Sequence, residues 1–343
     1  MRCIFSIRFY QELAQNIHII KKRMLKRLTI HLSEAIRVER WLIKQIENEA
    51  ISIPTTVIYT YWLDSPSTGV AFAKMKHPEI KLVSRAHRFD LYENVHDPPY
   101  LPFRHFVMAQ INAIFLISKH GQKYLAGKYP QYSEKCIVSR LGVIDPGFVS
   151  AQSSDGVFRI VSCSYLAPVK RIDLLIEGLR EVGTLRPEER FEWTHLGYGP
   201  EAEKLKRKAL TELPSNVKYK FLGYVGPGEV IEYYKHNRID AFINVSRSEG
   251  IPVSIMEAQS CGIPVIATGV GGTSEIISQD VGFLLCENPT PQDISRAILE
   301  IADDPNRANG MKKQAKDNWQ CSFNAETNYS EFANSLYHIG DGS

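Results

Sequence analysis

Two glutamates, Glu249 and Glu257, stand eight residues apart in a largely apolar segment. Ionised side chains are seldom buried without a hydrogen-bond partner or an opposite charge, so each acid needs a polar group to hold. If a helix begins near Pro252, the segment between the two acids spans roughly 12 Å. That length suits a ligand with two polar regions, for example a sugar at one end and a ribose at the other.

Two adjacent cations, Lys170 and Arg171, follow a predicted strand and precede a helical segment. Cations at such a turn can neutralise a diphosphate, because phosphate there also meets free N–H groups of the helix. A solvated pair without a ligand is the alternative, since exposed charges constrain little.

Glycine-rich turns and one histidine complete the candidate chemistry. Gly197 and Gly199 lie between a predicted strand and a predicted helix, where glycine lets the backbone approach a ligand closely. The pattern is neither GxGxxG nor a P-loop, so it does not favour dinucleotide binding or a P-loop NTPase. His87 follows the apolar run Ile80–Val83, and ligands of parallel sheets bind at such strand ends, although a lone histidine is usually structural.

Alternating strands and helices must position these residues. From Val157 onward, strands are predicted at Phe158–Cys163, Phe191–Leu196, Val217–Leu222, Ala241–Val245, Pro264–Ala267 and Gly282–Leu285, with helices at Asp173–Val182, Glu201–Leu210, Val253–Ser260 and Pro291–Ile301. A shorter series precedes it, with strands at Thr55–Tyr61, Ile80–Ser84, Ala113–Ile117 and Lys135–Ser139 and a helix at Lys119–Lys128. These patterns predict an α/β protein with two doubly wound sheets facing a cleft.

The domain boundaries follow from this pattern. A Pro, Gly and Ser-rich stretch at residues 145–156 is suited to a linker. We therefore expect an amino-terminal domain at 1–148, a ligand-binding domain at 149–318 and a carboxyl-terminal helix within 319–343 that crosses back to the first domain. That helix is expected to be capped near Ser322 or Asn324.

Composition limits the class of protein. The chain has 343 residues, 44% of them hydrophobic and 23% charged, as in soluble globular proteins. A net charge of +3 does not argue for nucleic-acid binding. The six cysteines show no CxxC pair, and there is neither a signal peptide nor a run that could span a bilayer, so we expect a cytoplasmic protein.

The segment 11–50 carries an apolar stripe at helical spacing with a basic side. The stripe comprises Ile17, Ile20, Met24, Leu28, Leu32, Ala35, Val38, Leu42 and Ile46, and the basic side comprises Lys22, Arg23, Lys26 and Arg27. Such a face is either a solvated surface or a contact with an anionic membrane, which would make the protein peripheral to the inner face of the plasma membrane. Residues 28–32 also alternate, so a strand there is a second possibility.

Five motifs in order resemble the family 4 glycosyltransferases of the GT-B fold across residues 157–338. They begin at Lys170, Gly197, Phe221, Ser248 and Gly262, and the segment Ser248–Ala258 carries most of the resemblance. The segments Tyr59–Trp62 and Ser84–Tyr92 resemble the branch that builds bacterial surface polysaccharides. The resemblance implies a metal-independent, retaining hexosyltransferase that needs no cofactor. Its substrates would be a nucleotide sugar, UDP- or GDP-linked, and a saccharide or lipid-linked acceptor.

The resemblance also implies roles for individual residues. Glu249 would contact the donor sugar, Lys170 would stabilise the leaving diphosphate, and His87 would lie near the donor sugar, which makes these three the catalytic candidates. The remaining donor-binding candidates are Arg171, Gly197, Gly199, Gly223, Gly250, Val253, Ser254 and Glu257, with Glu257 on the ribose hydroxyls and the amides of Val253 and Ser254 near the phosphates. No metal ligands are expected.

The sequence departs from the family in two places. Tyr165 stands where the family usually has an arginine, and Arg171 is the candidate substitute for that cation. The glycine-rich loop that opens the family's amino domain is missing before Tyr59, which predicts an incomplete first domain. An inactive donor-binding fragment or scaffold is therefore the main alternative function, and a sugar-nucleotide epimerase is a further one.

Overall fold

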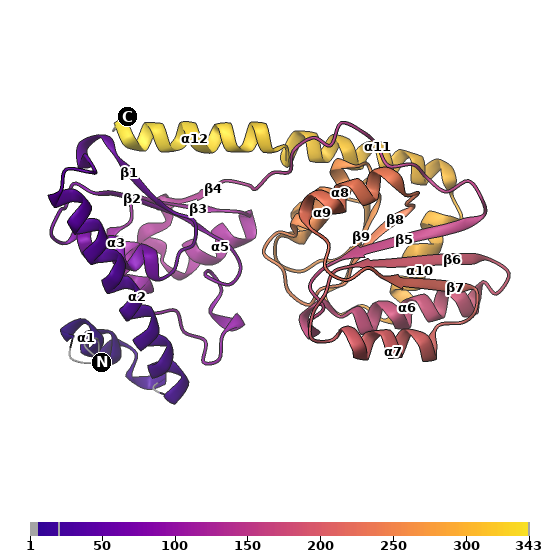
Figure 1. Cartoon of the computed structure of the whole chain (residues 1–343), viewed down its shortest axis with the longest axis horizontal. Coiled ribbons are helices and arrows are strands. Elements are labelled where there is room, and N and C mark those ends of the chain that lie inside the picture. Colours follow the sequence, from indigo (N-terminus) through magenta and orange to yellow (C-terminus); the bar gives the residue numbers. More distant parts are fainter. Residues whose placement is uncertain (1–5, 20, 342–343) are drawn as a thin grey trace. The chain divides into compact units, whose positions relative to one another are not determined.

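The computed structural model of the chain describes residues 6–19 and 21–341, and the chain folds into two compact units (Figure 1). The first unit comprises Met1–Arg140 with Ser330–Ser343, and the second comprises Leu141–Tyr329. The boundary lies before the stretch at 145–156 that the sequence suggested as a linker. That stretch belongs to the second unit, where the Ser150 amide donates to the Cys261 carbonyl at 2.8 Å and the Ser153 amide to Asp240 at 2.9 Å.

The first unit is built on a parallel sheet in the order β1-β2-β3-β4. Its strands are β1 (Val57–Thr60), β2 (Lys81–Ala86), β3 (Ala113–Leu116) and β4 (Cys136–Val138). Its helices are α1 (Ile7–Gln15), α2 (Lys22–Glu47), α3 (Ser65–Lys74), α4 (Arg104–Gln110) and α5 (Lys119–Lys128). Alternate residues of β2 and β3 pack on opposite faces, as the two-residue period of a strand requires. Leu82 and Ile114 join the core beneath α3, α4 and α5, whereas Val83 and Phe115 face residues of the last helix.

Helix α2 runs through the segment for which a strand was a second possibility, so the strand alternative at residues 28–32 is wrong. Met24, Leu28, Leu32 and Ala35 are fully buried, and their spacing of three and four residues places them on one helical face. Ile17 precedes this helix and is 71% exposed, so the predicted stripe does not extend to it. Ile20 lies outside the described residues.

The second unit is built on a parallel sheet in the order β10-β9-β8-β5-β6-β7. Its strands are β5 (Val157–Cys163), β6 (Arg190–Leu196), β7 (Val217–Phe221), β8 (Ala241–Asn244), β9 (Val265–Thr268) and β10 (Gly282–Leu285). Its helices are α6 (Ile172–Leu185), α7 (Ala202–Glu212), α8 (Pro227–His236), α9 (Val253–Ser260), α10 (Pro291–Ala302) and α11 (Pro305–Ser322). In Figure 1, α8 and α9 lie on one side of this sheet and α6 and α7 on the other. The predicted doubly wound architecture is confirmed.

The last helix, α12 (Ala325–Asp341), begins in the second unit. The side chain of Asn324 caps it by accepting from the amide of Glu326 at 2.9 Å, as expected. Later in the helix, Phe332, Leu336 and Ile339 pack on the sheet of the first unit. The carboxyl-terminal helix thus joins the core of the first unit.

Candidate functional site

The strand order of the second unit has a switch point between β5 and β8. The chain runs outward from β5 through β6 to β7 and then returns to place β8 on the other side of β5. Helices on the two sides of such a point diverge, which opens a crevice at the carboxyl ends of the two strands. Lys170 follows β5 and Glu249 follows β8, so the topology delivers both candidates to this crevice.

Lys170 and Glu249 form an ion pair, with 2.6 Å between the Lys170 Nζ and Glu249 Oε1 atoms. Their side chains are 23% and 11% exposed. Asn244, the last residue of β8, lies 3.5 Å from the same carboxylate oxygen through its Nδ2 atom. The site therefore holds a fixed cation and a fixed carboxylate in a partly dry environment, where both charges act more strongly than in water.

Two backbone contacts hold the loops of this pair in place. The amide of Arg247 donates to the carbonyl of Val169 at 2.8 Å, which joins the loop after β8 to the loop after β5. The amide of Gly272 donates to the carbonyl of Gly250 at 2.7 Å. Gly271 has a φ of +56°, and a Cβ atom there would collide with the carbonyl oxygen of Glu249. Gly271 thus positions the Glu249 backbone by close packing, and the Gly250 carbonyl fixes the next residue through its hydrogen bond.

Glu257 lies on α9 and differs from Glu249 in having no ion-pair or hydrogen-bond partner for its carboxylate among residues 6–19 and 21–341. Burial raises the pKa of Glu257 to about 7. The pKa of Cys163, at the end of β5, is raised to about 12 by its own burial and next by the Glu257 charge, whereas Lys170 lowers it. Glu257 and Lys170 therefore act electrostatically on the same strand end. An unpaired, half-buried carboxylate beside a crevice is typical of ligand-binding sites.

The first turn of α9 adds backbone donors. Pro252 precedes the helix, and Val253 and Ser254 are its first two residues. The first N–H groups of a helix lack partners within it, and we find no acceptor for these two amides in the part of the chain that the structure describes. They supply partial positive charge at the start of the Glu257 helix.

Arg171 does not lie free in the crevice. Its Nε atom donates to the Val245 carbonyl at 2.6 Å, and one Nη donates to the carbonyls of Ser246 at 3.0 Å and Glu287 at 2.9 Å. The residue is 7% exposed and adopts a left-handed backbone conformation with a φ of +49°. These contacts argue against the predicted phosphate role, because the guanidinium is used to fasten the loops after β8 and β10. Tyr165, where the family usually has arginine, is 61% exposed.

The predicted glycines after β6 pack closely against the backbone of the loop after β5. A Cβ atom on Gly197 would collide with the carbonyl oxygen of Ser164, and one on Gly199 with the backbone of Leu166. The Gly197 amide donates to the Gly223 carbonyl at 2.8 Å. Gly197 and Gly199 therefore bring the loops after β5 and β6 together by close packing, whereas at Gly223 open space surrounds the Cβ position and the φ of +78° favours glycine. Neither reason needs a ligand.

His87 follows β2 in the first unit, as predicted. Its ring lies 4.6 Å from the Tyr61 ring and 4.3 Å from the Trp62 ring, measured between centroids. Both ring nitrogens are buried and lack a hydrogen-bond partner in the described chain. Burial, and secondarily Arg85, lowers the pKa of His87 to about 4, so the ring is neutral at physiological pH. Its proximity to the donor sugar stays a prediction.

The sequence reasoning did not name Asn244, Tyr61 or Trp62 as site residues, although the segment Tyr59–Trp62 was part of the family resemblance. Asn244 is the final residue of a buried strand next to the switch point, so the rule that ligands meet strand ends could have identified it. Tyr61 and Trp62 follow β1 directly and are 51% and 44% exposed. Two exposed aromatic residues at a strand end are the signal that could have marked them.

The basic side of α2 is only partly free. Lys22, Arg23 and Lys26 are exposed. Arg23 forms an ion pair with Asp97, and Arg27 donates to the carbonyls of Pro98 at 3.1 Å and Tyr100 at 2.9 Å. In the described residues, no helix combines the length and apolar character needed to cross a membrane.

Residues 148–318 match the family model for glycosyl transferases group 1. Among curated proteins, the chain is 30% identical over 231 residues to the GtfA subunit of a UDP-N-acetylglucosamine–peptide N-acetylglucosaminyltransferase from Streptococcus parasanguinis, a match that covers 64% of this chain and 42% of that protein. It is 27% identical over 246 residues to the amylovoran biosynthesis glycosyltransferase AmsK from Erwinia amylovora, covering 68% and 58%. The matches thus span about half the length of these relatives.

Solved structures share the fold. A glycosyltransferase from Rickettsia africae superposes with a TM-score of 0.71 at 16% identity, covering 90% of this chain and 82% of that chain. The Anabaena protein HepE, solved in complex with UDP and glucose, gives 0.65 at 19% identity, covering 82% and 77%. Together with the crevice geometry, these matches show that the chain has the GT-B fold and that its residues 148–318 form a domain of the group 1 glycosyltransferase family.

Proposed function

We propose that this protein transfers a sugar from a nucleotide-sugar donor to a saccharide or lipid-linked acceptor in surface polysaccharide biosynthesis. The observation that carries the proposal is the ion pair of Lys170 and Glu249 at the switch point of the second sheet, where the Glu257 charge also acts on Cys163 at the end of β5. Curated relatives named for amylovoran and O-antigen biosynthesis support the pathway class. Structural neighbours solved with UDP and a sugar support the donor class.

In this proposal the donor lies across the crevice. Glu257 accepts hydrogen bonds from the ribose hydroxyls, which supplies the partners that its carboxylate lacks. Lys170 and the amides of Val253 and Ser254 contact the diphosphate and stabilise the charge that develops as the nucleotide leaves. Glu249 contacts the donor sugar and keeps Lys170 oriented through their 2.6 Å ion pair.

We infer a retaining, metal-independent hexosyl transfer. Lys170 and the start of α9 supply positive charge at the diphosphate, which is the task a divalent cation performs in metal-dependent transferases. The leaving phosphate accepts the proton of the attacking acceptor hydroxyl as that oxygen bonds to the anomeric carbon. His87, neutral because of its lowered pKa, would bring no charge to the transfer.

A screen of UDP- and GDP-linked sugars by thermal shift tests donor binding first, because a ligand of the folded state raises the melting temperature by mass action. Transfer is then measured with the stabilising donor and a saccharide acceptor, with and without a chelator. Lys170→Ala and Glu249→Ala should each abolish transfer and leave the protein folded. The exposed ion pair between Lys206 and Glu203 on α7, 3.0 Å long, provides matched alanine controls that should retain transfer.

The outcomes separate the alternatives. Stabilisation by a nucleotide sugar without transfer would favour the inactive donor-binding protein, and conversion of the donor sugar alone would favour an epimerase. Normal turnover by Lys170→Ala or Glu249→Ala would contradict the proposed mechanism. An anomeric proton analysis of the product by nuclear magnetic resonance distinguishes retention from inversion.

We also propose that the exposed cations Lys22 and Lys26, with Arg23, hold the protein at an anionic membrane surface on the cytoplasmic side. Charges on a surface helix attract anionic lipids, and salt screens that attraction. Flotation with phosphatidylglycerol vesicles should therefore be lost at high salt. Salt-independent flotation, or no flotation at low salt, would contradict a role for this basic side.

A further inference from the structure

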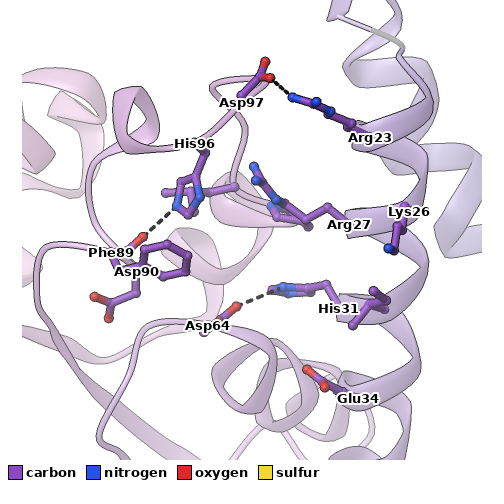
Figure 2. Close-up of a pocket in the computed structure, with 13 residues that line it drawn as sticks. Arg23, Lys26, Arg27, His31, Glu34, Asp64, Phe89, Asp90, His96 and Asp97 are labelled. Carbon is purple, nitrogen blue, oxygen red and sulfur yellow. Dashed lines mark hydrogen bonds and ion pairs between the residues drawn. The ribbon is translucent and has the colours of Figure 1, made fainter. Parts of the chain in front are cut away.

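A pocket of about 390 Å³ lies in the first unit, between the first half of α2 and the segment that follows β2. Figure 2 shows Arg23 and Arg27 extending from α2 toward Asp97 and His96 on that segment, and His31 extending toward Asp64. None of the predicted site residues of the second unit lines it. The pocket therefore requires an explanation separate from the donor site.

The acids of the pocket already have partners. Asp97 pairs with Arg23, and Asp64 lies 3.1 Å from the Nδ1 atom of His31. Asp90 accepts from the amides of Leu63 and His87 at 2.7 and 2.8 Å, and Glu34 accepts from the Ser65 hydroxyl at 2.8 Å. Asp97 and Asp64 are thus paired with basic groups of the lining, whereas these contacts of Asp90 and Glu34 come from uncharged donors.

Two cations of the lining, Lys26 and Arg27, have no carboxylate partner in the part of the chain that the structure describes. Arg27 uses one nitrogen, Nη1, for the carbonyls of Pro98 and Tyr100. Lys26 is exposed and has no ion-pair or hydrogen-bond partner among the residues that the structure describes. Burial lowers the pKa of His96 and the Arg27 charge lowers it further, whereas the hydrogen bond to the Phe89 carbonyl and the Asp64 charge raise it. An anionic group is thus the chemistry that this end of the pocket favours.

The rest of the lining is apolar. Ile30 and Phe89 are 50% and 57% exposed, and Leu101 and Pro102 complete the wall. Large apolar side chains that remain this exposed around a concave surface mark a binding site for apolar groups. The ligand must therefore combine an anion with a hydrocarbon part.

We propose that this pocket binds a phosphate ester of an apolar chain, with the phosphate on Arg27 and Lys26 and the chain along Ile30 and Phe89. Such an ester has two possible sources, the carrier of a lipid-linked saccharide acceptor and the headgroup of an anionic membrane lipid. The first source rests on the proposed transferase function and narrows its acceptor to a lipid phosphate. The second source is independent of transfer.

Three soluble probes separate the two requirements of the site. Isothermal titration calorimetry with octyl phosphate, inorganic phosphate and octyl glucoside compares the whole ligand with its charge alone and its chain alone. We expect octyl phosphate to bind at least about tenfold more tightly than either partial probe. Equal affinity for octyl phosphate and either partial probe would overturn the proposal, because the site would then lack one of the two recognition elements.

Variants on one helix locate the binding. Lys26→Gln and Ile30→Ser should each weaken octyl phosphate binding at least about fivefold. Lys44→Gln is the matched control, since Lys44 is an exposed lysine of α2 outside the pocket and should leave affinity unchanged. Lys26 and Ile30 are exposed, so these changes leave the core intact, whereas Arg27→Gln also removes two loop contacts. Equal weakening by Lys26→Gln and Lys44→Gln would reduce the effect to general surface charge and overturn the proposal.

Vesicle flotation identifies the source of the ester, and thermal shifts with nucleotide sugars test the donor site separately. If octyl phosphate displaces the protein from phosphatidylglycerol vesicles, the pocket holds a membrane lipid headgroup; if flotation is unaffected, the pocket holds the acceptor carrier. Nucleotide-sugar thermal shifts are measured on the same variants and should not change. A protein that binds octyl phosphate but no nucleotide sugar would contradict the proposed transferase function and leave the pocket assignment standing.

Discussion

Replacing Glu257 by glutamine should stabilise the ligand-free protein at alkaline pH while weakening nucleotide-sugar binding. Burial raises the pKa of Glu257 from 4.5 to about 7. Between these values the folded protein keeps a proton that the unfolded chain has released. Stability therefore falls as pH rises from about 4.5 to about 7, because the carboxyl group must become charged in surroundings that disfavour the charge. Glutamine keeps the shape of the side chain without that charge.

The size of the effect follows from the pKa difference. The interval between 4.5 and about 7 corresponds to at most about 3 kcal/mol of unfolding free energy. Glu257 retains some solvent access, so we expect about 1–2 kcal/mol at pH 8. In a domain of this size that gain raises the melting temperature by about 2–8 °C. At pH 4, where the wild-type carboxyl group is neutral in the folded and largely neutral in the unfolded state, the gain should nearly vanish.

Thermal unfolding of the wild-type protein and Glu257→Gln at pH 4 and pH 8 provides the assay. Glu203→Gln on α7 is the control, since its side chain is 80% exposed and its change should move neither melting temperature. With nucleotide sugar present the sign should reverse, because losing charge-assisted bonds to the ribose weakens binding about tenfold or more. A variant that is less stable at pH 8, equally stabilised at both pH values, or unchanged in donor affinity would refute the reasoning.

Three further outcomes are expected. Gly271→Ala should lower the free energy of unfolding by about 1–3 kcal/mol, because Gly271 has a positive φ and a Cβ atom there would collide with the Glu249 carbonyl. Gly310→Ala on α11 is the control: the Cβ position of Gly310 has open space around it, so this variant should not be destabilised in the same denaturant titration. Arg171→Gln should lower the melting temperature but change nucleotide affinity little, and a large affinity loss in an undiminished fold would restore its phosphate role. His87→Gln should leave the shape of the pH–rate profile between pH 5.5 and 7.5 unchanged, because the pKa of His87 is about 4.

Local sequence patterns were sufficient to predict the strands in the sheet of the second unit. Each predicted strand from Phe158 to Leu285 corresponds to one of β5–β10, and the predicted helix Val253–Ser260 coincides with α9. Apolar runs bounded by glycine and proline determine such elements within a few residues of chain. The boundary between units was harder to predict, because Ser150 is fixed by a carbonyl at Cys261, more than a hundred residues further along the chain.

In the candidate site, too, some contacts could be predicted from the sequence and others could not. Lys170 and Glu249 could be predicted to meet, since strand ends on both sides of a switch point converge. The use of Arg171 could not be predicted, because it depends on three carbonyls from the loops after β8 and β10. The pocket beside α2 could not be predicted from the sequence either, because it forms only when Arg27 contacts a segment about seventy residues away along the chain.

Two acids of one short motif end in opposite electrostatic states, and that difference points to function. Glu249 is compensated by Lys170 at 2.6 Å, as a structural carboxylate would be. Glu257 is held on a helix among buried neighbours with its pKa raised and no compensating cation in the described chain, a state that reduces stability at neutral pH. A protein that needed only to fold would gain by placing glutamine or an apolar residue there. The retained carboxylate is best explained by a ligand whose hydroxyl groups satisfy it, which makes Glu257 the sharper test of donor binding.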